Sequence, residues 1–139
     1  MSVWTHVNGA VRLDDYSFLS SKRNTQKDVE KIIGPMCLFD KWNKNTKLPL
    51  GSEGSIEYKV IQNTEESCVA RFNILFWGDL RDYDDLDEII QWFNNLKKEI
   101  ESKETFMQYR DAILSCECEM GNSIVIKLNT KTNQLEVIK

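Results

Sequence analysis

The chain holds a single histidine, His6, among its 139 residues. Histidine is the commonest general base near neutral pH, so its scarcity excludes most acid–base mechanisms except one centred on the first predicted strand. A Cys-His pair that includes His6 stays open, but a serine triad cannot form elsewhere. A position beside Trp4 on one strand face is more typical of a surface residue than of a catalyst. We therefore expect no catalytic residue, and a binding protein rather than an enzyme.

Long hydrophobic runs are also lacking. The longest apolar stretches, such as residues 74–77, are far shorter than the ~20 residues that cross a bilayer. The first residues have neither the basic start nor the apolar run and cleavage site of a signal peptide. We expect a cytoplasmic protein that has no membrane partner.

The cysteine pattern offers neither a disulfide framework nor a standard metal site. Without an export signal, the four thiols are expected to be reduced and mostly buried. They are Cys37, Cys68, Cys116 and Cys118. The last two alternate along a strand, unlike the Cys-x-x-Cys knuckle that holds zinc, so packing in the core explains them better. The sequence predicts no metal and no cofactor.

The net charge of the chain is −4, from 18 Lys and Arg against 22 Asp and Glu. This acidic balance argues against direct nucleic-acid binding, which depends on basic side chains that displace counterions from phosphates. By segment, residues 1–47 carry +3, residues 48–95 carry −7 and residues 96–139 carry 0. Such an uneven field steers basic partners, so we expect a host protein with a basic surface.

Alternation of apolar and polar residues with a period of two predicts the strands. One long strand is expected from Val3 to Leu13, although Asn8-Gly9 is also typical of a hairpin turn. Residues 55–62 and 68–77 predict an antiparallel hairpin, and the second of these strands is expected to be central. Strands are also expected up to residue 119, beginning as early as 106, and at 124–128 and 135–138.

Two amphipathic segments predict helices. Thr25-Gln26-Lys27-Asp28 resembles a capping box and opens a short helix at 25–33, before Gly34-Pro35. Apolar residues at helical spacing predict a longer helix at 85–101, with Asp84 as its cap and acidic residues in its first turn. Between these helices, residues 36–54 read as a long loop that places three side chains on the core: Leu38, Phe39 and Trp42.

The order of elements predicts the fold class. The chain contains the succession strand, helix, strand, strand, helix, strand of a ferredoxin-like antiparallel sheet with two helices on one face. A C-terminal β-meander follows. We expect an α+β two-layer sandwich that forms a single domain over residues 1–139, because a hydrophobic share of 41% suffices for one core.

The segment Gly78–Tyr83 is the preferred contact loop. It links a buried strand to the longest helix, and loops held by such a scaffold commonly carry binding residues. Arg81 lies between acidic neighbours and either pairs with them or meets a ligand. The candidate partner- or ligand-binding residues are Trp77, Asp79, Arg81, Asp82, Tyr83 and Asp85.

The acidic residues around this loop have two explanations. Carboxylates are the natural ligands of Mg²⁺ or Ca²⁺. An EF-hand loop begun at Asp82 would need glycine and glutamate where Asp87 and Phe93 stand, so that specific test fails. Helix capping and first-turn charge account for Asp84 to Glu88 without a ligand, and a weak metal site is the lesser alternative.

The segment Gly51-Ser52-Glu53-Gly54 is a possible ligand loop. It precedes a strand and has no Gly-Lys-Ser/Thr ending, whereas a phosphate-binding Walker loop follows a strand and opens a helix. A flexible turn that enters the hairpin is the simpler explanation. The glycines also leave room for a ligand to approach.

Three short segments resemble small proteins encoded by phages and prophages of Firmicutes-type hosts. They are Met-Ser-Val-Trp-Thr-His-Val-Asn-Gly at 1–9, Gly-Ser-Glu-Gly-Ser at 51–55 and Gly-Asp-Leu-Arg-Asp-Tyr at 78–83. The resemblance carries no catalytic residue. It implies an anti-defence or host-takeover protein that acts by binding, as anti-CRISPR proteins do.

We therefore expect a non-catalytic protein that binds and inhibits a host defence protein through its acidic surface. One alternative is a sponge for a small nucleotide signal, in which Arg81 pairs with phosphate and aromatics such as Trp4 stack on a base. A toxin-immunity protein is another, and a metal-dependent hydrolase that uses the acidic cluster is a third.

Overall fold

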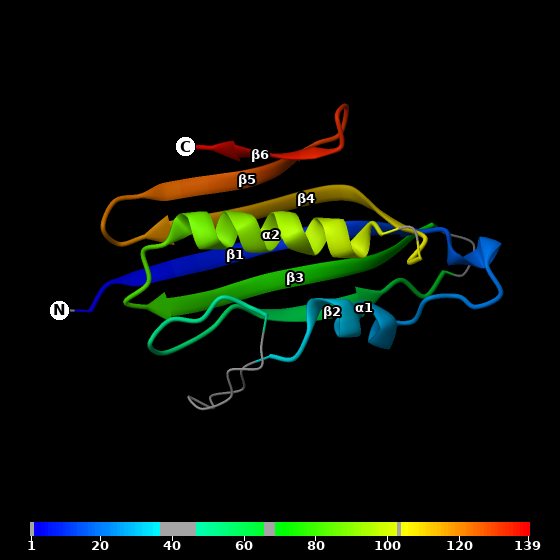
Figure 1. Ribbon diagram of the computed structural model, residues 1–139, viewed down its shortest axis with the longest axis horizontal. Helices are drawn as coiled ribbons and strands as arrows, with labels where there is room; N and C mark the ends of the chain where they lie inside the picture. Colours follow the sequence, from blue (N-terminus) through cyan, green and yellow to red (C-terminus); the bar gives the residue numbers. More distant parts are fainter. Residues whose placement is uncertain (1, 37–46, 66–68, 103) are drawn as a thin grey trace.

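The computed structural model describes residues 2–36, 47–65, 69–102 and 104–139, which form an open antiparallel sheet of six strands with two helices. The strand order is β2-β3-β1-β4-β5-β6 (Figure 1). The elements are β1 (Trp4–Asp15), a short 3-10 turn (Ser17–Leu19), α1 (Gln26–Ile33), β2 (Glu57–Gln62), β3 (Ala70–Arg81), α2 (Leu86–Ile100), β4 (Met107–Cys118), β5 (Ser123–Asn129) and β6 (Gln134–Ile138). The predicted α+β class is confirmed.

The first strand is one continuous strand, and the hairpin alternative at Asn8-Gly9 is wrong. β1 pairs with β3 on one side and with β4 on the other, so Gly9 lies opposite both Phe76 and Leu114. A Cβ atom on Gly9 would lie 2.5 Å from the Ile113 carbonyl oxygen. The glycine therefore permits close approach of β4 and does not turn the chain.

The remaining strands follow the sequence pattern closely. β2 and β3 form the predicted hairpin, and β4, β5 and β6 follow one another in both the chain and the sheet, which is the predicted meander. The centre of the sheet consists of the three longest strands, β1, β3 and β4, which have twelve residues each.

Both helices begin at side-chain caps. Thr25 and Asp28 form the predicted capping box of α1, and Gly34 ends that helix with a φ of 100°. The cap of α2 is Asp85, not Asp84, because the Asp85 side chain accepts a hydrogen bond from the Glu88 amide. Asp87 and Glu88 still occupy its first turn, next to the positive end of the helix dipole.

The core lies between the helices and one face of the sheet. Figure 1 shows α2 in front of the central strands, with α1 beside β2 and β3. Odd residues of β1 such as Val7, Val11 and Leu13 are fully buried, as are Phe72 and Phe93. Leu38, Phe39 and Trp42 lie outside the described residues, as do Cys37 and Cys68.

The other sheet face, which we call the open face, carries the even residues of β1 and the odd residues of β3. These side chains include Asn8, Arg12 and Asp79, which are exposed, and His6, which is partly exposed. The sheet thus has one face that the helices cover, which stabilises the fold, and a second face that is available for contacts.

Candidate functional site

The two sequence segments chosen as candidate sites lie against each other. The Ser52 amide donates to the Arg81 carbonyl over 2.9 Å, and the Arg81 amide donates to the Glu53 carbonyl over 3.0 Å. A bridge between Leu50 and Ser55 closes the turn. The 51–54 loop therefore extends the sheet at the end of β3, and its residues share one surface with Asp79 and Arg81.

The two glycines of the 51–54 loop allow the backbone of the loop to lie close to the backbone of β3. A Cβ atom on Gly54 would lie 2.0 Å from the Asp79 carbonyl oxygen, and one on Gly51 would lie 2.5 Å from the Arg81 amide nitrogen. Gly54 also has a φ of 73°, in the left-handed region that favours glycine. The space that glycine leaves is thus filled by β3 itself.

The expected contact loop at 78–83 is mostly strand, which corrects the sequence-based boundary. β3 continues through Gly78 to Arg81 because its other neighbour is the 50–55 turn, which approaches Gly78 at Ser55. Leu80 is consequently buried in the core, while Asp79 and Arg81 alternate with it on the open face. Only Asp82 and Tyr83 of this segment lie beyond the strand.

Arg81 is held by its neighbours. Its Nη1 atom pairs with Glu53 Oε1 at 2.7 Å, and its Nε atom donates to Ser2 Oγ at 2.9 Å. Asp82 Oδ2 lies 3.8 Å from the same Nε atom. The guanidinium therefore has acidic partners on two sides, which reduces what it can offer to a phosphate.

Asp82 joins three segments. Its amide donates to the Val3 carbonyl at 2.6 Å, and its carboxylate accepts from Ser52 Oγ at 3.1 Å. Its φ of 51° is in the left-handed region, where aspartate is one of the few side chains that are tolerated. These contacts fix the N-terminal segment and the 51–54 loop against the end of β3.

His6 lies in a carboxylate cluster that the sequence pattern did not predict. Its Nδ1 atom is 2.6 Å from Asp79 Oδ1, and its Nε2 atom is 3.2 Å from Glu119 Oε1. The hydrogen bond to Asp79, followed by that to Glu119, raises the pKa of His6 above its usual 6.5. Alternation placed His6 on the open face, but its partners belong to β3 and to the residue after β4, so only the strand order could identify them.

The two candidate aromatics have different surroundings. Trp77 is 40% exposed on the open face, and its Nε1 atom donates to Glu57 Oε2 at 2.9 Å. Tyr83 was a candidate contact residue, but it is buried in the core, where burial raises its pKa. The buried Thr5 hydroxyl donates to the Tyr83 carbonyl, which holds the residue inward. Tyr83 therefore supports the core and does not supply contact surface.

An acidic rim borders this end of the sheet. We use that name for five exposed carboxylate residues from the 51–54 loop, the connection between β3 and α2 and the first turn of α2: Glu53, Asp82, Asp84, Asp85 and Asp87. Three of these have local roles, since Glu53 and Asp82 hold Arg81 and Asp85 caps α2. The predicted surface is thus divided, with Trp77 and Asp79 on the open face and the rim beyond it.

The described part of the chain contains neither a reactive thiol site nor a group of metal ligands. Cys116 and Cys118 are free and buried, and burial raises the pKa of the Cys116 thiol to about 12. Among the described residues, no three His, Cys, Asp or Glu side chains are grouped as metal ligands.

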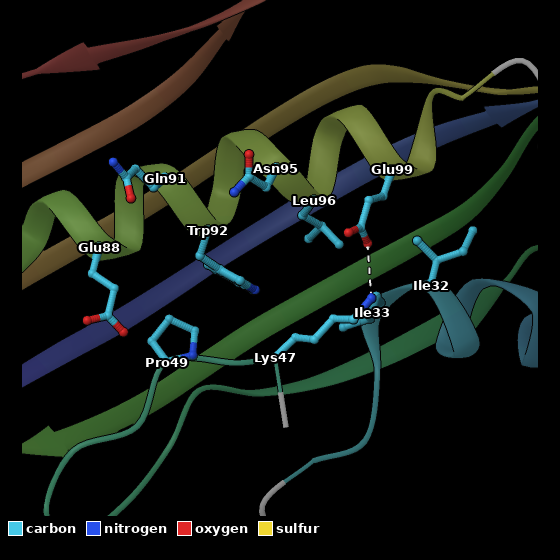
Figure 2. A pocket seen from close by; sticks show the side chains of 10 residues that line it. All are labelled: Ile32, Ile33, Lys47, Pro49, Glu88, Gln91, Trp92, Asn95, Leu96 and Glu99. Atoms are coloured by element: carbon cyan, nitrogen blue, oxygen red, sulfur yellow. Dashed lines mark ion pairs between the residues drawn. The ribbon is translucent and has the colours of Figure 1, made fainter. Parts of the chain in front are cut away.

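A cavity of about 280 Å³ lies between α1, α2 and residues 47–49. Figure 2 shows Trp92 and Leu96 reaching from α2 toward Pro49 and α1, with Lys47 paired to Glu99 across the opening. Trp92 packs edge-on to Phe76, with ring centroids 5.4 Å apart. The sequence pattern gives no sign of this cavity, although Trp92 is next to the apolar stripe of α2. None of the predicted site residues lines it.

Comparison with protein-family models, with curated proteins and with solved structures gave no match. Within the described residues, none of the helices combines the length and the apolar character that crossing a membrane requires.

Proposed function

We propose that this protein is a non-catalytic inhibitor that binds a host defence protein through the acidic rim. The observation that carries the proposal is the concentration of exposed carboxylates from two separate segments on one firmly held end of the sheet. Glu53, Asp82 and Asp85 are fixed by their own hydrogen bonds or ion pairs. A surface rich in carboxylates raises the association rate of a basic partner. Because the side chains are already held in place, they lose little conformational entropy on binding.

The proposal places the protein in the host cytoplasm, as the resemblance to phage and prophage proteins implies. The free, buried thiols of Cys116 and Cys118 suit a reducing compartment. The partner would be a protein with a basic surface, and neither nucleic acid nor a membrane would be bound directly.

The finer assignment of the fold is part of the same proposal. We propose that β1 to β4 and the two helices form a ferredoxin-like two-layer unit, which β5 and β6 extend. The order β2-β3-β1-β4 and the succession of strands and helices support it. Such a unit uses one sheet face for its helices and leaves the other for contacts.

Two alternative functions are a nucleotide sponge and a toxin-immunity protein. A nucleotide sponge would need a cation that is available for phosphate, and the pairing of Arg81 with Glu53 weakens that alternative. A nucleotide that binds the native state would raise the melting temperature, so a thermal-shift screen tests the sponge directly. A toxin-immunity protein would use the same kind of acidic surface, and the identity of the captured protein distinguishes it.

Capture from host lysate with matched variants tests the leading proposal. The wild-type chain should recover one dominant protein in a stoichiometric complex, and the activity of that protein should fall as the chain is added. The double variant Asp84→Asn/Asp87→Asn removes rim charge but leaves the Asp85 cap, and it should weaken binding about tenfold. Raising the salt concentration should weaken the wild-type complex as well.

The control variant is Glu65→Gln/Glu104→Gln, which removes the same charge from exposed positions outside the rim. It should bind like the wild type. Equal loss in both double variants, or no recovered protein at low salt with the rim intact, would contradict the proposal.

A further inference from the structure

The open face of the sheet carries a band of large apolar side chains. Leu75 on β3 and Ile113 on β4 flank Ala10 in one row across the strands, and Trp77 lies in the next row, opposite Asn8. Their exposed fractions are 39%, 44% and 40%. Ile61 and Ile138 extend the band toward the two edge strands. An exposed apolar patch of this extent is typical of a surface that another protein covers.

Charges of opposite sign lie at the two ends of this band. The rows of Asn8 and His6 hold three carboxylates on the open face: Glu57, Asp79 and Glu117. The rows of Ala10 and Arg12 hold three cations: Lys59, Lys127 and Arg12. Asp111 and Glu136 lie opposite two of these cations and offset them in part. The face is therefore acidic toward the start of β1 and more basic toward its end.

We propose that a second copy of this chain packs against the open face, so that the protein is a face-to-face homodimer. The two copies are related by a two-fold axis that lies between the sheets, perpendicular to the strands, and passes between the rows of Asn8 and Ala10. This axis brings Trp77 of each copy over Leu75 of the other. It also brings Glu57 of each copy opposite Lys59 of the other, which makes two ion pairs across the contact, whereas Glu117 on β4 comes opposite Asp111 of the other copy.

The area of the face fits a stable dimer. Six strands at a spacing of ~4.8 Å are about 25–30 Å wide, and seven residues of a strand are about 24 Å long. The footprint is roughly 650 Å² for each copy, close to the ~800 Å² of a standard interface. Two stacked sheets would then share a dry layer of side chains, as the two sheets of a β-sandwich do.

The proposal does not depend on the proposed function, because the acidic rim lies beyond the band and remains accessible in the dimer. The two are also tested separately. Rim variants change capture of the host protein, whereas variants of the open face change the mass of the purified chain.

Sedimentation equilibrium of the purified full chain measures the dimer. The wild type should have twice the 16.3 kDa mass of one chain. Leu75→Lys and Ile113→Lys should each give a folded monomer, because an unpaired cation in the apolar band opposes the contact. Leu19→Lys changes an apolar side chain that is 71% exposed and outside the sheet, so this control should stay dimeric. Circular dichroism verifies that each variant folds.

Charge exchange tests the orientation of the two copies. Glu57→Lys alone and Lys59→Glu alone should both be monomeric, since each places like charges opposite one another. An equimolar mixture of the two variants should restore a dimer, because both contacts between positions 57 and 59 then join opposite charges. A variant that had merely lost its fold could not be rescued by mixing.

Two results would overturn the proposal. A monomeric wild type at about 100 µM excludes the dimer, since interfaces of this size bind with Kd values from micromolar to picomolar, and it leaves the face to a different protein. A dimer that persists in both Leu75→Lys and Ile113→Lys is held by another surface.

Discussion

At the scale of single residues, the surroundings of His6 differ most from those that the sequence predicted. It lies between two carboxylates, Asp79 and Glu119, that belong to different parts of the sheet. Its side chain is 40% exposed and theirs are 68% and 48% exposed, so solvent screens both ion pairs. The contribution to stability is therefore small, about 0.5–1 kcal/mol.

The pH dependence of this contribution has a definite sign. Because the pKa of His6 is raised in the folded state, the stabilisation is complete below the unfolded pKa of about 6.5 and is lost as the pH rises through the folded pKa. Urea unfolding from pH 5.5 to 8.5 should show this loss in the wild type and not in His6→Gln. An NMR titration should give a pKa above 6.5 that falls in Asp79→Asn; a value at or below 6.5 in the wild type would contradict the assignment.

Sequence alone could place residues on a face of a strand but could not name their partners. Alternation put Asn73 and Trp77 on one side of the second hairpin strand correctly, whereas Asp79 was expected in the loop after it and lies in β3. Tyr83 was chosen as a contact residue, but it is buried in a core whose other members are mostly distant in the chain. The partners of His6, and Glu53 as a partner of Arg81, are hidden for the same reason. Pairing of Arg81 with its neighbour Asp82, by contrast, was one of the two expected outcomes.

At the scale of elements, the helices, the β2–β3 hairpin and the C-terminal meander were predictable because their signals are local. The Thr25–Asp28 capping box and the apolar stripe of α2 are complete within their own segments. The end of β3 was not predictable, since the strand continues past Gly78 between two distant segments, the start of β1 on one side and the 50–55 turn on the other. Gly78, which the sequence pattern indicated as the end of the strand, is here a residue at which β3 and the 50–55 turn come into close backbone contact.

Substitution of Gly54 measures how firmly that turn is attached to β3. Gly54→Ala adds a Cβ atom 2.0 Å from the Asp79 carbonyl oxygen, at a φ of 73°. Gly121→Ala is the matched control, because its φ is 93° and no atom lies within 4 Å of the added Cβ. Gly121→Ala should cost about 1 kcal/mol of unfolding free energy, and Gly54→Ala about 1–3 kcal/mol more. Equal losses in urea unfolding would show that the close approach carries no energy.

At the scale of the whole molecule, the sheet separates two surfaces with different uses. The helices cover one face and close the core, and the open face carries an apolar band with opposite charges at its ends. The class of the fold followed from the order of elements in the sequence. The self-complementary face did not, since it needs the register of all six strands.

A dimer makes the melting temperature depend on protein concentration. Mass action stabilises the associated native state, so the wild-type Tm should rise by several degrees between about 1 and 100 µM. Ile113→Lys should melt at one temperature over the same range. Differential scanning calorimetry of both chains makes the comparison, and a wild-type Tm that is independent of concentration would count against association through the open face.

The position of β1 in the sheet also governs how the chain can fold. This first strand lies between β3 and β4, and its contacts reach across 113 positions from His6 to Glu119. Contacts so distant in sequence make folding slow, because a large loop must close before they form. During synthesis the ribosome releases β1 first, yet that strand cannot complete its pairing until β4 has emerged. The nascent chain therefore carries β1 without its β4 partner until residue 118 has emerged, and the sheet cannot close before then.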